Sequence, residues 1–335
     1  MTAVNQSSAL PKNLYLEVTN RCNLRCKGCI LYKGNWEPDR DISFDELTMI
    51  TDQLPDLEQI MLHGVGEPLL NPDLPQMIRH LKNRNVYTLF NSNGILLDAG
   101  WQHELVDAGL DELRVSLDAA TPEGYRKIRN NSEFERIVQN LRSFLKVQSA
   151  KQVSHPRLSL WFLGTEDNIF ELPEFVQLAN DIGIGDIYLQ RLVYFQDNDG
   201  YGVARSTKSL QNSDGAYWEL IQKSQEIATR LGIRFNASGL CRPGESIQSE
   251  ARAESPWMKC YRPSTLVYIT ANGNLLPCCI SPFSTIDFAS IVLGNVFETS
   301  LEQLWHGTRY KTFREKLQSS APPKCCQGCG VLWSL

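Results

Sequence analysis

The chain has 335 residues, is 42% hydrophobic and 21% charged, and carries a formal net charge of -5 at pH 7. These values are typical of a globular protein, and the negative charge argues against a basic nucleic-acid surface. No apolar run approaches the roughly 20 residues that span a bilayer, and the N-terminal residues do not resemble a secretory signal. We therefore expect a cytoplasmic protein that binds neither nucleic acid nor membrane. Its ten cysteines are then metal ligands or reactive thiols rather than disulfides.

Strand-like segments alternate with helical patterns over the first two-thirds of the chain. Six such strands begin near residues 13, 59, 86, 112, 157 and 186. Strands and helices that alternate at this spacing indicate parallel βα units. One face of several strands is polar, which suits a barrel that holds a polar ligand better than a barrel filled with apolar side chains. An open sheet with one solvated face is the alternative, although parallel sheets are normally covered on both faces. We predict an α/β fold with a partial (β/α)6 TIM-like barrel.

The pattern changes from about residue 195, where a polar loop and a helix near residues 215–231 precede a link rich in proline and charge. A β-hairpin with an Asn272-Gly273 turn and short helices then follow. We expect a second, small domain of hairpin and helices that is rich in cysteine at both ends. The predicted division is a tail at 1–11, the barrel at 12–235, a linker at 236–259 and the cysteine-rich domain at 260–335.

Three cysteines, Cys22, Cys26 and Cys29, follow the first strand within eight residues. A structural zinc site usually has four ligands, and disulfides need an even number. Thiolates in such groups are iron–sulfur ligands, and three of them leave one coordination position open. The loop comes at the carboxyl end of its strand, where barrel enzymes place their chemistry.

The segment CNLRCKGC resembles the CxxxCxxC motif of the radical S-adenosylmethionine (SAM) superfamily. In that family three cysteines hold a [4Fe-4S] cluster whose free iron binds SAM, and reductive cleavage of SAM gives a 5'-deoxyadenosyl radical. The resemblance covers about residues 12–195. It implies SAM as cofactor and an electron donor such as flavodoxin or ferredoxin as partner.

Segments after later strands resemble the motifs that contact SAM in this family. HGVGEPLL resembles the GGEP motif, with Val65 in place of its first glycine, and YRKIRN resembles the segment whose arginine reaches the SAM carboxylate. NSNG and VSLDA end the third and fourth strands. Each could be an ordinary turn alone, but their order after successive strands favours SAM binding. The residues that the resemblance implies are Gly66, Glu67, Pro68, Asn91, Ser92, Asn93, Ser116, Asp118 and Arg129. Gln190 joins them because it lies on the polar face of the sixth strand.

A second set of cysteines comprises Cys260, Cys278, Cys326 and Cys329. Four thiolates suit either structural zinc or a complete four-iron cluster. The spacing from Cys260 through Gly273 to Cys278 resembles the SPASM/Twitch extension of radical SAM proteins. This resemblance implies an auxiliary [4Fe-4S] cluster, and the absence of further cysteines after Cys329 indicates the shorter Twitch type.

The remaining thiols and one carboxylate leave alternatives open. Cys325 could replace Cys326 as a ligand, and Cys279 is expected to pack near the cluster. Cys241 is either a small core hydrophobe or a hydrogen-atom donor that faces the substrate. Glu17 faces the expected cavity and is an acid–base candidate if burial perturbs its pKa.

The resemblance implies an oxidoreductase-type enzyme that abstracts a hydrogen atom from an unactivated C–H bond. An auxiliary cluster with four protein ligands has no open iron, so we expect it to accept an electron and give net oxidation. The cluster loop starts at residue 22, which leaves no room for a preceding peptide-binding domain. We therefore expect a small-molecule substrate, such as a sugar, cyclitol or nucleoside-like molecule. The alternatives are a peptide or protein maturase, an epimerase or decarboxylase on the same scaffold, and a non-catalytic iron–sulfur sensor.

Overall fold

The computed structural model describes residues 9–32, 36–192, 208–210, 216–238, 243, 255–283, 285 and 287–327. Its strands are β1 (Asn13–Leu16), β2 (Gln59–Met61), β3 (Tyr87–Ser92), β4 (Glu112–Ser116), β5 (Arg157–Gly164), β6 (Asp186–Arg191), β7 (Arg234–Ala237), β8 (Leu266–Ile269), β9 (Asn274–Leu276) and β10 (Gly294–Asn295). Its α-helices are α1 (Phe44–Asp52), α2 (Leu74–Asn83), α3 (Ala99–Asp107), α4 (Pro122–Arg129), α5 (Phe134–Lys151), α6 (Leu172–Ile182), α7 (Ala216–Leu231), α8 (Arg262–Thr265), α9 (Phe288–Ile291), α10 (Leu301–His306), α11 (Thr308–Leu317) and α12 (Lys324–Gln327). Short 3-10 helices are η1 (Ile30–Tyr32), η2 (Pro68–Leu70), η3 (Ile169–Glu171), η7 (Pro256–Lys259) and η8 (Ser281–Phe283).

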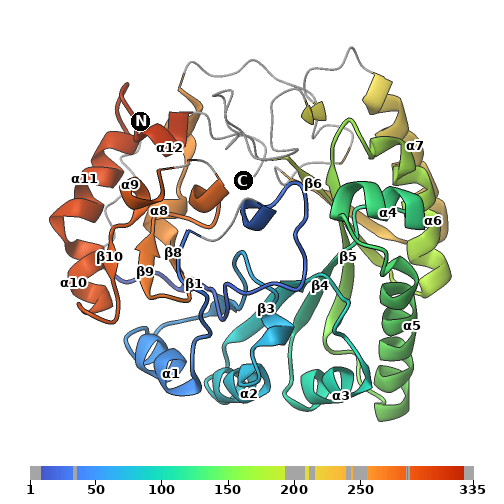
Figure 1. Cartoon of the computed structure of the whole chain (residues 1–335), viewed down its shortest axis with the longest axis horizontal. Coiled ribbons are helices and arrows are strands. Elements are labelled where there is room, and N and C mark those ends of the chain that lie inside the picture. Colours follow the sequence, from blue (N-terminus) through green and yellow to red (C-terminus); the bar gives the residue numbers. More distant parts are fainter. Residues whose placement is uncertain are drawn as a thin grey trace.

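All ten strands belong to one sheet in the order β10-β9-β8-β1-β2-β3-β4-β5-β6-β7. Strands β1 to β7 are parallel and follow one another in chain order. Helices α1, α2, α3, α5 and α6 lie along the outer side of the curved sheet (Figure 1). The predicted α/β fold is confirmed, with the six expected strands as β1 to β6 and a seventh, β7, beside β6. Among the described strands the sheet is not closed, because β10 and β7 form its two edges.

The C-terminal hairpin extends the barrel sheet. Strand β8 pairs in parallel with β1, and β9 pairs antiparallel with β8 across the Asn272-Gly273 turn. Gly273 has a φ of +82°, and a Cβ there would overlap the ring of Phe297, so this turn requires glycine. The hairpin is therefore continuous with the barrel. At the other edge β7 runs across residue 235, where the sequence places the end of the barrel.

The strands separate an apolar face from a polar one, as their alternation predicts. In β1, Leu14 and Leu16 are fully buried in the core that packs against the helices. On the opposite face, polar side chains such as Arg114, Ser116 and Gln190 line a cavity. Helix α1 begins with a capping box, in which Ser43 accepts a hydrogen bond from the Glu46 N–H. Within the described ranges, the helices are too short or too polar to cross a bilayer.

Candidate active site at the carboxyl ends of the parallel strands

A cavity of about 1010 Å³ lies on the polar face of the sheet. We call it the main cavity. The three cysteines of the first motif line it, together with residues from the SAM-motif segments and from the C-terminal hairpin. The predicted site residues in this lining are Cys22, Cys26, Cys29, Gly66, Glu67, Asn91, Ser92, Asn93, Ser116, Arg129 and Gln190. These residues come from positions 22 to 190, which is about half of the chain, and the fold brings them to one cavity, as the order of the motifs after successive strands predicts.

The cluster loop, residues 20–40, is closed at its base by backbone and side-chain hydrogen bonds. The Asn20 amide donates to the Pro38 carbonyl at 2.8 Å, and its oxygen accepts from the Arg40 N–H at 2.7 Å. Below these residues, the Ile42 N–H donates to the Val18 carbonyl at 2.9 Å. The two ends of the loop therefore leave the sheet as a short antiparallel pair. This pairing holds the cysteine-bearing loop at the carboxyl end of β1.

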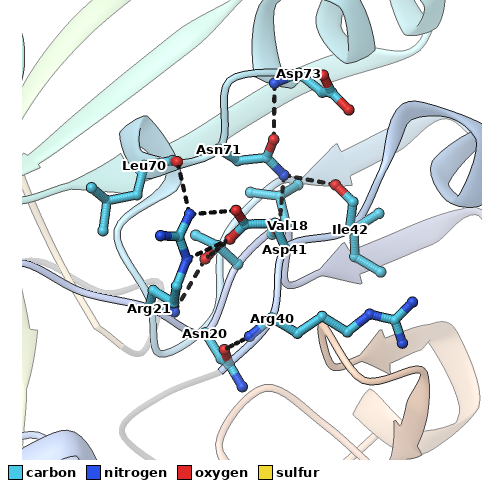
Figure 2. A network of polar contacts seen from close by, with 10 residues as sticks. Val18, Asn20, Arg21, Arg40, Asp41, Ile42, Leu70, Asn71 and Asp73 are labelled. Carbon is cyan, nitrogen blue, oxygen red and sulfur yellow. Dashed lines mark hydrogen bonds and ion pairs between the residues drawn. The ribbon is translucent and has the colours of Figure 1, made fainter. Parts of the chain in front are cut away.

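An ion pair and one buried amide fasten this base to the segment after β2 (Figure 2). The Arg21 guanidinium pairs with Asp41 and also donates to the Leu70 carbonyl at 3.2 Å. The Asn71 amide donates to two backbone carbonyls, one from each end of the loop base, both at 2.8 Å. The two carbonyls belong to Val18 and Ile42, which also pair with each other at the base of the loop. Sequence reasoning missed Asn71, which reads as a turn residue before Pro72.

The thiols of the cluster loop are partly buried, and hydrogen-bond donors lie close to two of their sulfur atoms. Burial raises the pKa of Cys22 to about 12 and that of Cys29 to about 11, so the thiols are protonated unless a metal binds them. The Leu24 N–H points at the Cys22 sulfur at 3.4 Å, and an Arg129 nitrogen lies 3.8 Å from the Cys26 sulfur. Donors of this kind stabilise cluster thiolates.

Glu67 holds the SAM-motif loop, residues 64–68, against the end of β3. Its carboxylate accepts hydrogen bonds from the Ser92 hydroxyl at 2.8 Å and the Asn93 N–H at 2.7 Å, and burial raises its pKa to about 7. The Glu67 N–H in turn donates to the Arg21 carbonyl at 2.8 Å. A Cβ on Gly66 would overlap the Thr19 carbonyl oxygen. This glycine therefore permits the close contact between the SAM-motif loop and the cluster loop.

Among the predicted SAM-binding residues in the wall of the main cavity, two buried polar atoms have no hydrogen-bond partner within the described part of the chain. They are the side-chain oxygen of Asn91 and the Nε of Arg129. The Asn91 N–H donates to His63, whose pKa burial lowers to about 3, so this imidazole is a neutral part of the wall. Buried polar atoms without partners are rare, and a polar ligand would satisfy both. The site therefore fits SAM, with Arg129 and Asn91 among the residues that would hold it.

Some expected site residues have other roles. Asp118 pairs with Arg129 and accepts the Leu163 N–H at 2.7 Å, so it orients the arginine and lies outside the cavity lining. Pro68 is buried at the start of η2 and is also outside the lining. The expectation that Glu17 faces the main cavity is wrong. Its carboxylate lies beneath the SAM-motif loop, at a smaller pocket.

A separate small pocket of about 20 Å³ is lined by the described cysteines Cys260, Cys278, Cys325 and Cys326. Cys279 differs from its neighbour, because it lines the main cavity and accepts a hydrogen bond from Arg262 at 3.0 Å. Arg262 lines both spaces and so forms part of the wall between them. The predictions for Cys241 and Cys329 concern positions outside the described residues. The choice between Cys325 and Cys326 as ligand stays open, since both line the small pocket.

Two protein-family models match the chain. Residues 16–179 match the radical SAM superfamily, and residues 260–330 match the SPASM iron-sulfur cluster-binding domain. The chain belongs to the radical SAM superfamily and carries a C-terminal SPASM-type auxiliary cluster domain. It is a radical SAM enzyme, and its cofactors are SAM and two [4Fe-4S] clusters. The iron–sulfur interpretation of the second cysteine set is thereby confirmed over zinc.

Proteins similar to this chain over nearly all of its length carry out different reactions. A tungsten-containing aldehyde ferredoxin oxidoreductase cofactor-modifying protein of Pyrococcus furiosus is 24% identical and aligns over 94% of this chain and 86% of its own. The PqqA peptide cyclase of Gluconobacter oxydans is 23% identical over 95% of this chain and 82% of its own. The solved structure of Streptococcus suis SuiB bound to SAM has a TM-score of 0.69 and 19% identity, covering 97% of this chain and 72% of SuiB. At this identity the likeness to SuiB shows the fold.

Proposed function

We propose that this radical SAM enzyme acts on a peptide or protein and abstracts a hydrogen atom from one of its side chains. The main cavity carries this proposal, because it joins the SAM-motif residues to a wall formed by Tyr15, Arg262 and Cys279. Its volume of about 1010 Å³ is at the upper end of the roughly 300–1,000 Å³ usual for one small ligand. SAM therefore leaves space for one compact group, such as an amino-acid side chain.

Two similar proteins support a peptide substrate. One, similar over nearly the whole chain, is named a peptide cyclase. The other, SuiB, has also been solved bound to its precursor peptide SuiA. These comparisons support the peptide alternative better than the sugar, cyclitol or nucleoside-like substrate that the sequence favours.

The residues of this chain would bind and orient SAM, and the cofactors would supply the radical and the electron acceptor. When bound, SAM and its cluster supply a 5'-deoxyadenosyl radical, and the auxiliary cluster supplies a one-electron acceptor. Arg129 and Asn91 would bind SAM through their unpaired polar atoms, and Glu67 holds the loop beside it. Overall, one substrate C–H bond breaks, its hydrogen atom ends in 5'-deoxyadenosine, and the substrate then loses one electron and one proton. The product of this sequence is a side chain oxidised by two electrons.

A small-molecule substrate is the second candidate, and the part of the main cavity at the amino ends of β4, β5 and β6 favours it. There Glu112 forms ion pairs with Arg114 and Arg157 at 2.7 Å, and Asp186 pairs with Arg157 at 3.0 Å. All four residues line the cavity. Such a polar end suits a hydroxylated or charged metabolite, and the similar Pyrococcus protein is named a cofactor-modifying protein.

The test compares substrate classes in one assay. Anaerobically reconstituted enzyme is incubated with SAM and dithionite, with either a peptide library or a panel of sugars, cyclitols and nucleosides. We expect peptides to raise 5'-deoxyadenosine formation above the substrate-free rate. Deuterium from a labelled side chain should appear in 5'-deoxyadenosine, and the peptide product should have two hydrogen atoms fewer than the substrate. The Cys22→Ala/Cys26→Ala/Cys29→Ala variant is the control, and its iron content should fall from about eight to about four. Stimulation by the metabolite panel alone would overturn the peptide proposal.

A further inference from the structure

The turn of the C-terminal hairpin, residues 270–274, lies directly behind the SAM site. We call it the hairpin turn. Strand β8, which leads into it, pairs in parallel with β1, from Asn13 with Leu266 to Leu16 with Ile269. The Glu17 N–H continues this pairing by donating to the Ile269 carbonyl at 2.9 Å. The hairpin turn is therefore placed at the same end of the sheet as the cluster loop.

Glu17 joins the hairpin turn to the SAM-motif loop. One carboxylate oxygen accepts the Val65 N–H at 2.7 Å, and the other accepts the Ala271 N–H at 3.2 Å. The residue is 1% exposed. A Cβ on Gly64 would overlap the same carboxylate, so the loop lies flat on it. One buried side chain thus holds the backbone of two segments that are about two hundred residues apart.

Glu37 joins the hairpin turn to the cluster loop in the same way. Its carboxylate accepts hydrogen bonds from the Asn274 amide at 2.6 Å and the Thr270 hydroxyl at 3.0 Å. Next to it, the Asn272 amide donates to the Pro38 carbonyl at 3.0 Å. The same carbonyl accepts the Asn20 amide that closes the base of the cluster loop. The hairpin turn therefore holds the returning arm of the loop that carries Cys22, Cys26 and Cys29.

We propose that the auxiliary domain positions the SAM site through this turn, with Glu17 and Glu37 as the positioning residues. The auxiliary domain then has a role in SAM binding that is separate from electron transfer. This inference depends on SAM binding at the site and is independent of the class of substrate. Since neither glutamate lines the main cavity, both act through the backbone of the two loops they hold.

The sharpest test is Asn274→Asp in the full-length, cluster-loaded enzyme. The substituted side chain would keep the oxygen that accepts the Asn295 amide at 3.1 Å, but would place a second carboxylate against Glu37. A broken buried contact of this kind should weaken SAM binding about tenfold. Affinity is measured by following the SAM-induced change in the EPR spectrum of the reduced cluster. Adding Glu37→Gln gives an amide that can donate to the new carboxylate, and should restore affinity to within about threefold.

A matched control and a second readout separate positioning from mere stabilisation. Glu58→Gln neutralises an exposed carboxylate that pairs with Lys12, as Glu37→Gln neutralises a half-buried one, and should leave SAM affinity unchanged. Hydrogen exchange of residues 59–70 should speed up in Asn274→Asp and return to normal in the double variant. If Asn274→Asp lowers only the unfolding midpoint, with affinity and exchange unchanged, the proposal is wrong. Thr270→Val, which removes one hydrogen bond to Glu37, gives the same test if Asn274→Asp does not fold.

Discussion

The two cysteine sites differ in how the chain assembles them and in what surrounds them. Cys22, Cys26 and Cys29 come from one loop and open into a cavity of about 1010 Å³. The described cysteines of the auxiliary site come from three segments and enclose a pocket of about 20 Å³. An open site can admit a reacting molecule, whereas a closed one holds its cluster and exchanges electrons through its wall. The open site also needs more support, which it receives from Asn71, Glu67 and the hairpin turn.

The largest effect should come from a side chain placed between the SAM-motif loop and the cluster loop, where the two backbones are in close contact. In Gly66→Ala, the new Cβ would overlap the Thr19 carbonyl, which is backbone and cannot move aside. We expect SAM affinity to fall by about a hundredfold or more. Gly185→Ala is the control, because a Cβ there meets no atom within 4 Å. Equilibrium dialysis of SAM against both variants checks the prediction, and equal affinities would contradict it.

Substitutions of Arg129 and Asp118 test how far SAM affinity depends on a charged residue outside the cluster loop. Arg129→Gln removes a cation that faces the cavity and leaves the Asp118 carboxylate buried without its partner. A loss of SAM affinity of about thirtyfold is expected, with a lower unfolding midpoint. Asp118→Asn keeps the arginine, so its loss of affinity should be smaller. If the two variants lose equal affinity, Arg129 serves only to neutralise Asp118.

The boundary between the two sites can be tested at Cys279. Cys260 lines the small pocket, whereas Cys279 lines the main cavity beside Arg262. Cys260→Ala should lower the iron content from about eight to about four, while Cys279→Ala should retain about eight. Iron and sulfide analysis after anaerobic reconstitution measures both. A halved iron content in Cys279→Ala would make it a cluster ligand.

A pH dependence of stability, rather than of SAM affinity, belongs to the support of the open site. Burial raises the pKa of Glu17 to about 7, with the nearby Glu37 adding to the rise. Because this folded pKa exceeds the unfolded one, the contribution is fully present below the unfolded pKa of about 4.3 and is lost as pH rises to about 7. Glu17 should therefore lower the free energy of unfolding by up to about 3 kcal/mol across this window. Urea unfolding from pH 4 to 8 should show this slope, and Glu17→Gln should flatten it.

The local part of the site could be predicted from the sequence. Cys22, Cys26 and Cys29 lie within one loop, and Glu67 and Asn93 follow strands whose apolar runs are plain. A parallel sheet brings the ends of successive strands to one edge, so their order in the chain gives their neighbourhood in space. The hairpin was also predictable, because Asn-Gly between two apolar runs favours a tight turn.

The rest depended on contacts between distant segments. The pairing of β8 with β1 joins residues about 250 positions apart, and no local pattern reports it. Strand β7 is short and has polar residues at Arg234 and Asn236, so it lacks an apolar run. Glu17 reads as a cavity residue from its parity in β1, but the SAM-motif loop folds over it. Likewise, Asp118 lies within the VSLDA motif, which suggests a contact with the ligand, whereas the side chain pairs with Arg129.

The pairing of β1 with β8 has a consequence for biosynthesis. Strand β1 is made long before β8, so one of its two partners follows only when Ile269 has been made. Until then β1 is an open edge of a growing sheet, which is a common origin of mispairing and aggregation. The hairpin turn reaches the cluster loop only after this edge is covered. Delivery of iron and sulfide to the nascent chain is therefore best timed after β8 has paired with β1 and the hairpin turn has reached the cluster loop.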